Sequence, residues 1–341
     1  MSLTALGVSA DCTESCFEAA EWRELLERDP NRHIFVTQEW GGGWWEEFKE
    51  GKDLFILRVR RGSEVVAIVP LYRKTEEDRR ILRFLGGIDL TDYLGPICSL
   101  EDRNDVAATL VLWLRDTTDV LWDEFDAHNM PVPLGFAEHL VDHVDRAGLA
   151  FELEQEETAA VLILPSDWET YLATLAKKQR HELRRKIRRL WNEHTDARVR
   201  TSAPDTLEAD LATFFAMHRG AHGHKGHFMN PEIATFFTRI ARTFMPLGWL
   251  KLDLLEASGK ALAATFSFEH NSRFYLYNSA FEPSAAAVSP GLVLVAHLLE
   301  RSIQQKLERF DFLRGPERYK YQLGAQAVPL NNVRVFRSPR E

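Results

Sequence analysis

The sequence predicts an α+β fold in two domains, each with a mixed, mostly antiparallel sheet flanked by helices. The length of 341 residues fits two domains, since a domain averages about 150 residues. The content of 45% hydrophobic and 27% charged residues is typical of globular proteins and excludes disordered, collagen-like and coiled-coil chains. Each half also repeats one order of elements: two helices, strands joined by hairpin-length links, a helix, then more strands. That order favours an α+β architecture and suggests duplication of the fold.

The first half begins with two expected helices, and the second of them carries Trp40, Trp44 and Phe48 on one face. These aromatic residues, with Trp45, are most simply core. A hairpin turn is expected at Arg61-Gly62. In order, the expected helices are 17–28, 37–48, 103–116 and 134–147, and the expected strands are 54–60, 65–72, 81–85, 93–97, 121–125 and 159–164.

A long basic helix, about 167–194, is expected to follow, with Ser166-Asp167 as its N-cap. The second half then repeats the pattern, with a hairpin turn at Ser258-Gly259. Its expected helices are 205–219, 231–245, 290–306 and 316–322, and its expected strands are 197–201, 249–256, 261–269, 273–281, 309–313 and 328–336. We therefore expect an N-terminal domain at 1–165, a basic connecting helix at 166–194 and a C-terminal catalytic domain at 195–341.

Charge is concentrated in the basic helix. The formal net charge is −9, yet residues 177–189 carry eight basic side chains and one acidic one. An acidic chain is an improbable general binder of nucleic acids. Arg180, Arg184 and Arg188 follow the i, i+4, i+8 spacing and project together, while five apolar residues, Leu172, Leu175, Leu183, Ile187 and Leu190, dock the helix. The arginine row can hold phosphates of a nucleotide cofactor or of tRNA, or it is a solvated face between domains.

Nothing in the sequence predicts a membrane segment or a metal cluster. No apolar run approaches the roughly 20 residues of a spanning helix, and the first residues lack the features of a signal peptide. The three cysteines, Cys12, Cys16 and Cys98, have no metal-ligand spacing. Their odd number, without an export signal, favours the reducing cytoplasm.

Two segments of the second half are candidates for chemistry. In the first, Ser289 suits a helix N-cap and Pro290 the first helical position. The free N–H groups of Gly291 and Leu292, with the helix dipole, then form an anion site suited to a pyrophosphate. The alternative is an ordinary, well-capped helix.

The second segment runs from Asp311 to Lys320, where a strand ends in a glycine and a charged short helix begins. Tyr319 can donate a proton there, and Lys320, expected in a helix too polar to be core, can stabilise an oxyanion. The alternative is a surface loop with salt links.

A histidine group follows one helix of the second half: His218, His222, His224 and His227. The first two have the i, i+4 spacing that metal sites use. Since no carboxylate or cysteine completes a set, we favour a polar loop at the cleft over a metal site.

Five segments, taken in order, carry a resemblance. They are Phe35–Trp40 with Trp44-Trp45 and Phe48, then Asp92-Tyr93, the basic run Lys178–Leu190, Ser289-Pro290-Gly291, and Asp311–Gly315 with Tyr319-Lys320. They resemble the motifs F-x-T-x-x-W…WW…F, D-Y, K-x-R-x-x-L-R-R, S-P-G and D-F-L-R-G-x-x-x-Y-K of CelD/BcsL-type acetyltransferases of the GNAT superfamily.

The resemblance implies two tandem GNAT-like domains, with the catalytic cleft in the second. It implies an N-acyltransferase that moves an acyl group from acetyl-CoA or another acyl-CoA to an amine by direct attack. The layout is also similar to Fem-type aminoacyl-tRNA-dependent ligases, which have a Phe-Lys pair in place of Tyr319-Lys320. The loop at 285–291 lacks the Gln/Arg and the paired glycines of ordinary GNAT phosphate loops.

We therefore expect the site residues in three groups. Lys320, Tyr319 and Asp311 are expected to be catalytic; Ser289, Gly291, Leu292, Arg180, Arg184 and Arg314 to hold the cofactor; and Asp92, Tyr93, His218 and Tyr277 to bind the substrate. The expected partners are a small-molecule acyl donor and an amine acceptor, without metal, DNA or membrane. Two alternatives stay open: an aminoacyl-tRNA donor, and a non-catalytic GNAT-fold binding protein.

The two halves are expected to differ in donor binding. At the place that matches Ser289-Pro290-Gly291, the first half has the segment 95–103, whose acidic residues would repel a pyrophosphate. It also has no counterpart of Arg314-Gly315…Tyr319-Lys320. We expect one donor cleft, in the second half.

Overall fold

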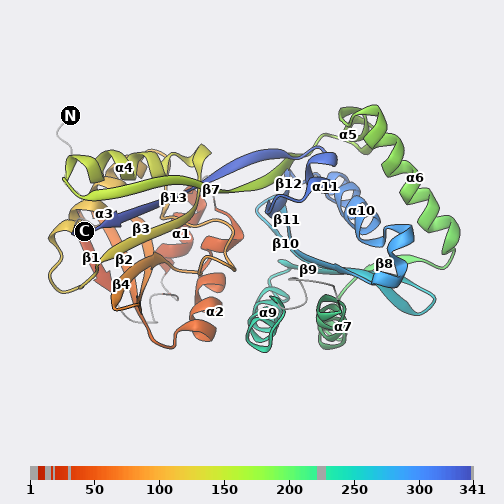
Figure 1. Cartoon of the computed structure of the whole chain (residues 1–341), viewed down its shortest axis with the longest axis horizontal. Coiled ribbons are helices and arrows are strands. Elements are labelled where there is room, and N and C mark those ends of the chain that lie inside the picture. Colours follow the sequence, from red (N-terminus) through yellow and green to blue (C-terminus); the bar gives the residue numbers. More distant parts are fainter. Residues whose placement is uncertain (1–6, 12–16, 18–19, 30–31, 221–227, 339–341) are drawn as a thin grey trace. The chain divides into compact units, whose positions relative to one another are not determined.

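The computed structural model describes residues 7–11, 17, 20–29, 32–220 and 228–338. The chain forms two compact units, one of residues 1–158 and 328–341 and the other of residues 159–327. Both are α+β with mostly antiparallel strands, so the predicted fold class is confirmed (Figure 1). Among the described helices, none combines the length and the apolarity that a membrane crossing needs.

The first unit is a sheet with the strand order β1-β2-β3-β4-β6-β13-β7, and β5 pairs with β3. Its parallel contact joins β4 to β6 at Ile81/Glu124 and Leu82/Phe125. Its strands are β1 (Gly7–Asp11), β2 (Lys52–Arg61), β3 (Glu64–Glu76), β4 (Arg79–Phe84), β5 (Ile97–Cys98), β6 (Glu124–Pro131), the first part of β7 (Ala150–Ile163) and most of β13 (Gln326–Phe336). Its helices are α1 (Ala20–Arg28), α2 (Gln38–Phe48), α3 (Arg103–Asp116) and α4 (Phe136–Arg146).

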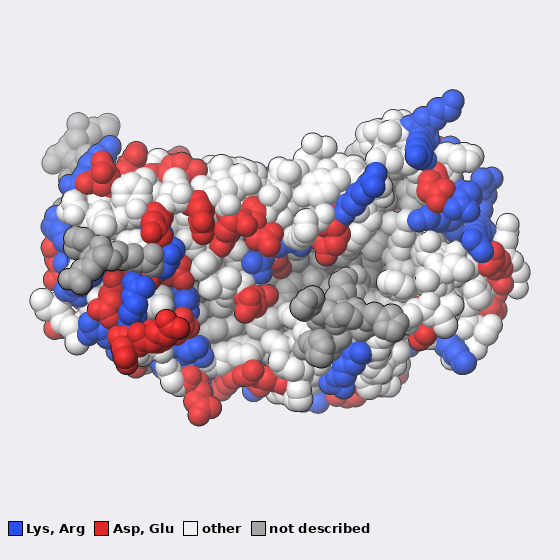
Figure 2. Space-filling model, in the orientation of Figure 1, with Lys and Arg blue, Asp and Glu red and all other residues white. Residues whose placement is uncertain are grey.

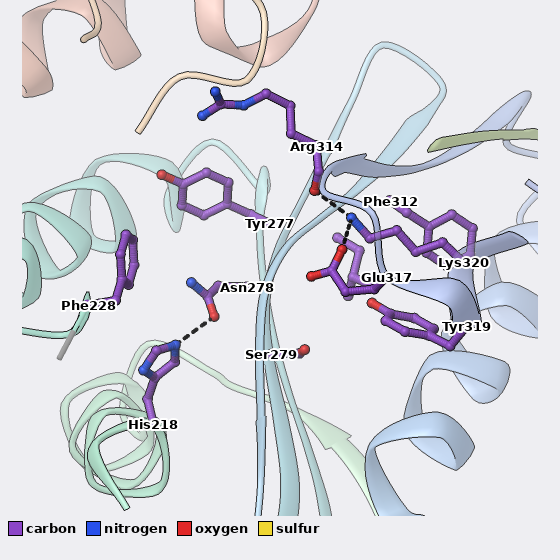
Figure 3. A pocket seen from close by; sticks show the side chains of 11 residues that line it. His218, Phe228, Tyr277, Asn278, Ser279, Phe312, Arg314, Glu317, Tyr319 and Lys320 are labelled. Carbon is purple, nitrogen blue, oxygen red and sulfur yellow. Dashed lines mark hydrogen bonds and ion pairs between the residues drawn. The ribbon is translucent and has the colours of Figure 1, made fainter. Parts of the chain in front are cut away.

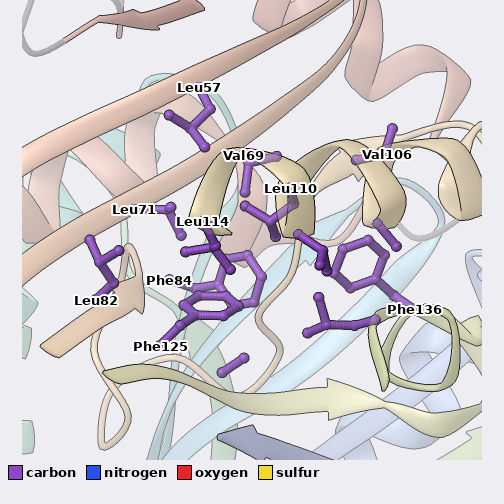
Figure 4. Close-up of a cluster of buried hydrophobic side chains, with 14 of the residues drawn as sticks. Leu57, Val69, Leu71, Leu82, Phe84, Val106, Leu110, Leu114, Phe125 and Phe136 are labelled. Carbon is purple, nitrogen blue, oxygen red and sulfur yellow. The ribbon is translucent and has the colours of Figure 1, made fainter. Parts of the chain in front are cut away.

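Helix α3 supplies much of this unit's core. Val106, Leu110 and Leu114 are buried at the i, i+4, i+8 positions of one helix face. Figure 4 shows Leu110 beside Val69 of the sheet, within a cluster that also contains Leu57. The spacing of apolar residues in the sequence therefore sets which face of the helix packs on the strands.

The second unit has the strand order β7-β12-β11-β10-β9-β8. Figure 1 shows α7 and α9 on one side of this sheet and α10 on the other, where α10 contacts α5 and α6. The further strands are β8 (Arg198–Thr201), β9 (Leu250–Ala257), β10 (Lys260–His270), β11 (Arg273–Phe281) and β12 (Arg309–Arg314). The helices are α5 (Trp168–Thr174), α6 (Lys177–Glu193), α7 (Leu207–Arg219), α9 (Pro231–Phe244), α10 (Pro290–Gln304) and α11 (Arg318–Gln322), with a 3-10 helix η4 (Pro283–Val288) before α10.

The predicted basic helix is two helices, α5 and α6. The expected N-cap is confirmed, since the Asp167 side chain accepts a hydrogen bond from the Thr170 N–H at 2.8 Å. The break follows at Leu175 and Ala176, which have extended ψ angles of 144° and 143°. Neither proline nor glycine marks it, so the sequence gives no sign of the interruption.

Other elements differ from the predicted ranges at their ends. The strand expected at 93–97 is only Ile97–Cys98, and β7 begins nine residues before the predicted position 159. Helix α6 lies within the second unit, and residues 328–336 lie in the first. The two units therefore divide the chain at places other than the predicted boundaries 165 and 194.

Candidate active site in the second unit

A cavity opens where two parallel strands part. Strands β11 and β12 pair at three positions, from Arg273/Arg309 to Tyr275/Asp311, although both strands continue beyond them. The residues that follow line a cavity of about 340 Å³ (Figure 3). The lining comprises Leu276, Tyr277, Asn278 and Ser279 of β11, Phe312 and Arg314 of β12, Glu317, Tyr319 and Lys320 of the next loop and helix, and His218 and Phe228.

A β-bulge shapes the β11 wall of this cavity. Phe266 of β10 pairs with Asn278, and Phe268 pairs with Tyr275. Between these pairs, one β10 residue, Ser267, lies opposite two β11 residues, Leu276 and Tyr277, so β11 carries one extra residue there. A bulge bends the strand and releases backbone groups from the ladder. Here it turns the strand at the point where a ligand in the cavity would meet it.

Tyr319 presents a protonated hydroxyl to the cavity. It lies on α11, and its ring meets Phe312 edge-on at 6.2 Å between ring centroids. Burial raises the pKa of the Tyr319 hydroxyl, and the nearby Glu317 charge raises it further. Because a raised pKa favours the neutral phenol, this side chain is a proton donor throughout the neutral pH range.

Lys320 lies in an environment that differs from the sequence expectation. The sequence placed it in a helix too polar to be core, but only 3% of its surface is exposed. Its ammonium forms an ion pair with Glu317 at 2.9 Å and donates hydrogen bonds to the backbone carbonyls of Leu313, Arg314 and Gly315. A buried lysine needs such partners to offset its lost hydration. Lys320 thus fixes the loop between β12 and α11.

The same loop requires the Asp-x-x-x-Gly part of the motif. Leu313 has a φ of +61°, a strained conformation for a branched residue, and its N–H donates to Asp311 Oδ1 at 2.8 Å. Gly315 has a φ of +118°, and a Cβ there would lie 2.3 Å from Glu317 Oε2. Asp311 therefore stabilises the turn, and only glycine leaves space for the ion pair.

His218 and Asn278 form the opposite wall. His218 of α7 is buried, and its Nε2 lies 3.0 Å from Asn278 Oδ1 (Figure 3). The sequence prediction included His218 and Tyr277 but missed Asn278, Ser279 and Glu317. Two adjacent polar residues in the otherwise apolar run 274–281 were the available signal.

The other histidines of the predicted group, His222, His224 and His227, lie outside the described residues. Among those that are described, no group of three or more His, Cys, Asp or Glu side chains is arranged to hold a metal ion.

A second cavity of about 200 Å³ lies between α6 and α11. It is lined by Lys178, Gln179, Glu182, Leu183 and Lys186 of α6, Leu292 of α10, and Arg318, Tyr319, Gln322 and Leu323. Tyr319 therefore lines both cavities.

The predicted phosphate loop ends at the start of α10. Ser289 is the N-cap residue, with a left-handed φ of 53° and no side-chain cap hydrogen bond, and Pro290 is in the first turn as expected. The first turn contains no acidic residue. A Cβ on Gly291 would lie 3.6 Å from the Phe281 ring, an ordinary contact. Of the predicted cofactor residues, Leu292 lines the second cavity and Arg314 lines the first.

Arg180 and Arg184 are not among the residues that line these two cavities. Arg184 forms an ion pair with Glu169 of α5 at 2.6 Å, and Arg180 donates to the Leu172 carbonyl at 3.4 Å. The cavity side of α6 is instead formed by Lys178, Glu182 and Lys186, which follow the i, i+4, i+8 spacing.

The two remaining predicted residues, Asp92 and Tyr93, belong to the first unit. Both are buried there, and the Tyr93 ring packs against His33 and Phe35 at 5.4 and 6.1 Å.

Residues 177–321 match the family model described as an acetyltransferase (GNAT) domain. The match begins with α6 and ends in α11, so it covers every residue that lines the first cavity and all but Gln322 and Leu323 of those that line the second. Among curated protein sequences, none matches this chain.

Solved structures extend the likeness to the whole chain. FemX has a TM-score of 0.67 at 10% identity, over 97% of this chain and 98% of that one. A tandem GNAT protein from the clavulanic acid biosynthesis pathway has a TM-score of 0.52 at 12% identity, over 98% and 100%. L-PGS from Bacillus licheniformis has a TM-score of 0.53 at 10% identity, over 94% and 91%. The chain thus has a GNAT acetyltransferase-like fold in tandem.

Proposed function

We propose that the protein is an N-acyltransferase that transfers an acetyl or other acyl group from acyl-CoA to an amine, in the manner of the CelD/BcsL-type enzymes. The observation that carries this proposal is the cavity between the parted strands β11 and β12, because it combines a bulged strand edge with a protonated tyrosine. The family-model match over 177–321 supports the same class of reaction.

The chemistry is direct attack of a neutral amine on the thioester carbonyl carbon. A C–N bond forms, the C–S bond breaks, and the nitrogen releases its proton to solvent. Backbone N–H groups at the β11 bulge polarise the carbonyl oxygen, and preorganised donors of this kind stabilise the charge that develops there. The Tyr319 hydroxyl gives its proton to the leaving thiolate.

Lys320, which lines the cavity, and Asp311, which does not, both act on this centre. The Lys320 ammonium holds three consecutive backbone carbonyls and keeps positive charge at the cavity wall. Asp311 fixes the Leu313 turn that leads to Arg314. We assign Asp311 a positioning role, and Lys320 both positioning and electrostatic stabilisation.

The acceptor and the donor are assigned to different groups of residues. His218 and Tyr277 are proposed to bind the acceptor, while Ser289, Gly291 and Leu292 receive donor phosphates, with Arg314 at the cavity rim. Asp92 and Tyr93 as acceptor residues, Arg180 and Arg184 as phosphate ligands, and a cytoplasmic location remain predictions from the sequence.

A second candidate donor is aminoacyl-tRNA. The observation in its favour is α6, where Lys177, Lys178 and Arg188 have no ion-pair partner among the described residues, in a helix already rich in positive charge. Figure 2 shows Lys and Arg gathered at this end of the second unit. The net charge of −9 opposes a broad RNA surface.

Titration calorimetry with acetyl-CoA, and separately with bulk aminoacyl-tRNA, tests the proposal. Acetyl-CoA binding, with thiol release in a panel of amines, supports the acyl-CoA reaction. Binding of tRNA alone favours the second donor. A protein that binds neither is the non-catalytic GNAT-fold module.

Tyr319→Phe removes only the proposed proton donor, so thiol release should fall about 100-fold or more with unchanged acetyl-CoA affinity. Tyr321→Phe on the same helix, outside both cavity linings, is the control. Equal rates for the two variants would remove Tyr319 from the mechanism.

A further inference from the structure

We infer that Asn278 selects the acceptor substrate, because its side-chain amide nitrogen donates a hydrogen bond to an oxygen that the acceptor carries close to its amino group. The acceptor class is then an amine with a neighbouring hydroxyl or carbonyl oxygen, such as an amino alcohol. The inference rests on the proposed N-acyl transfer, and it adds the chemistry of the acceptor and the side chain that recognises it.

The β11 bulge brings Asn278 onto the cavity wall. In a regular strand, consecutive side chains point to opposite faces of the sheet, but a bulge interrupts this alternation. The Tyr277 ring packs on Phe237 of α9 at 5.4 Å between ring centroids. The next residue, Asn278, contacts His218 of α7. Because α7 and α9 lie on the same side of the sheet (Figure 1), both side chains face that side, and both line the cavity.

His218 fixes the orientation of the Asn278 amide. The His218 Nε2 lies 3.0 Å from Asn278 Oδ1, and because a carboxamide oxygen only accepts, the imidazole N–H donates. His218 is only 2% exposed, and its ring lies 5.9 Å from the rings of Phe214 and Phe228, which leaves it little room to turn. With its oxygen held, the amide directs its nitrogen the other way. Figure 3 shows that nitrogen facing the space beside Phe228 and Tyr277.

The Asn278 amide nitrogen is accessible to a ligand. Within the part of the chain that the structure describes, the Asn278 side chain has one hydrogen-bond partner, His218, and this contact uses the amide oxygen. Asn278 is half-buried, so the nitrogen is neither sealed in the core nor fully hydrated. An amide N–H binds oxygen acceptors and cannot accept a bond from an ammonium. The group that it recognises is therefore an oxygen of the ligand.

The charges of the lining favour the same class of acceptor. Among the described residues of the lining, Arg314 and Lys320 are cations and Glu317 is the acid. The Glu317 carboxylate is engaged by the Lys320 ammonium at 2.9 Å. A second ammonium on the acceptor would meet like charge and an occupied carboxylate, which is unfavourable. An amine with a second polar group that is an oxygen fits this lining better than a diamine.

Two triplets of amines test the acceptor class. One triplet is propylamine, ethanolamine and ethylenediamine, and the other is methylcyclohexylamine, aminocyclohexanol and diaminocyclohexane, each with its second group on the adjacent ring carbon. Within each triplet, only that group changes, from methyl to hydroxyl to amino. The measurement is kcat/KM for thiol release from acetyl-CoA. We expect the hydroxyl amine to exceed the methyl amine by about tenfold, as one hydrogen bond allows, and to exceed the diamine.

Variants of the pair assign this preference. Asn278→Leu replaces the amide by an apolar group of similar size, so the ratio of hydroxyl to methyl amine should fall close to one. His218→Phe keeps a ring but removes the N–H that holds the amide, so the ratio should fall as well. As a positioning residue, His218 acts through Asn278, and the double variant should therefore have the same ratio as Asn278→Leu alone.

The ratio separates recognition from damage to the fold. A purely structural defect lowers the rates for all amines together and leaves the ratio unchanged. Thermal melting checks each variant, and Asn278→Ala is the second variant at that position. Tyr277→Phe tests the competing assignment, in which the Tyr277 hydroxyl donates to the acceptor oxygen.

Several outcomes would overturn the inference while leaving the proposed function intact. These are a wild-type protein that does not prefer the hydroxyl amines, a preference that survives both Asn278→Leu and Asn278→Ala, and a preference that only Tyr277→Phe abolishes. If other amines release thiol but neither triplet reacts, the assigned acceptor class is wrong and the inference falls alone. If no amine releases thiol from acetyl-CoA, the inference and the proposed function both fall.

Discussion

Each unit has a gap where two parallel strands part, and this gap is filled in the first unit but open in the second. In each, a parallel pair of strands parts after a few residues: β4 and β6 in the first unit, β11 and β12 in the second. In the first unit the chain itself fills the space beyond the pair. The buried Asn129 side chain donates to the carbonyls of Ile88 and Thr91, and Asn129 accepts from the Leu94 N–H. In the second unit the space is the cavity of about 340 Å³.

The helix that follows each gap repeats this difference. In the first unit, the residue before α3 is Asp102, whose carboxylate forms an ion pair with Arg61 at 2.6 Å. A carboxylate of the chain is thus present at this helix start, although it accepts no hydrogen bond from the helix N–H groups. Before α10 there is Ser289, with no acid in the first turn. One architecture therefore yields a closed scaffold and an open site, depending on which side chains occupy the gap.

Filling the second gap should produce the largest effect. Ser279→Trp places an indole in the cavity lining, in the way that residues 85–94 occupy the first unit. We expect acetyl-CoA binding and thiol release to disappear, because the acyl arm has no room, while the melting temperature changes little. Calorimetry and a thermal melt measure both. Retained binding at wild-type affinity would show that the donor lies elsewhere.

Removing the Lys320 charge should produce the second largest effect, a fall in the rate of thiol release. Lys320→Met keeps the apolar stem but leaves three carbonyls and Glu317 without the ammonium, so the rate of thiol release should fall by about 10²–10³, with some loss of stability. Glu317→Gln is the companion variant, because it keeps the lysine contacts to the carbonyls. A similar fall in both variants would mean that the ion pair, and not the ammonium itself, matters.

The first unit contains a charged network on its sheet, and the histidine of this network titrates above neutral pH. His128 of β6 contacts Asp126 at 2.8 Å and Glu156 at 2.5 Å. Burial opposes the protonated imidazole, but the two carboxylates outweigh it and raise the pKa of His128 to about 9. Asp126, also held by Arg83, has a lowered pKa, for which its hydrogen bond to His128 is the main favourable cause.

This network predicts a pH dependence of stability. A histidine whose pKa is raised on folding contributes its full stabilisation below about pH 6.5 and loses it as the pH passes 9. The expected loss is about 3 kcal/mol of unfolding free energy. Urea denaturation from pH 6.5 to 9.5 measures it, and His128→Asn should flatten the curve. An identical slope in that variant would assign the dependence to other groups.

Alanine substitutions at two glycines of the second unit should produce the smallest effect, which is a difference in unfolding free energy. Gly315→Ala forces a Cβ into the Glu317 carboxylate at positive φ, so we expect a loss of about 2 kcal/mol in unfolding free energy. Gly291→Ala makes only an ordinary contact with Phe281 and should change stability by less than about 0.5 kcal/mol. Equal losses in the two variants would contradict the geometry of the loop after β12.

The sequence could predict that part of the candidate site in which the residues proposed for the chemistry also determine the local backbone conformation. The Asp311–Lys320 motif was readable because its glycine, aspartate and lysine are needed for one turn, whose contacts are local. The element order predicted the fold because apolar spacing determines helices such as α3 and α10. Asn278 could not be assigned, since its importance depends on a partner, His218, that lies 60 residues away.

The orientation of α6 was likewise beyond the sequence. Its rows of lysines and of arginines both follow helical spacing and lie about 200° apart around the axis. The packing of Leu183 and Leu190 in the core shared with α10 decides which row borders the cavity. Local periodicity identifies a basic helix, but only tertiary contacts select its functional face.

The path of the chain has a consequence for synthesis on the ribosome. The second unit, 159–327, is inserted between two parts of the first, and β13 returns to pair with β6. Every residue of the second unit is therefore translated before the first unit receives its last strand. The second unit can complete its sheet while the first unit still waits with β6 unpaired on one side. A chain truncated before residue 328 would have every strand of the second unit but would lack the last strand of the first, whose exposed strand edge is a target for chaperones.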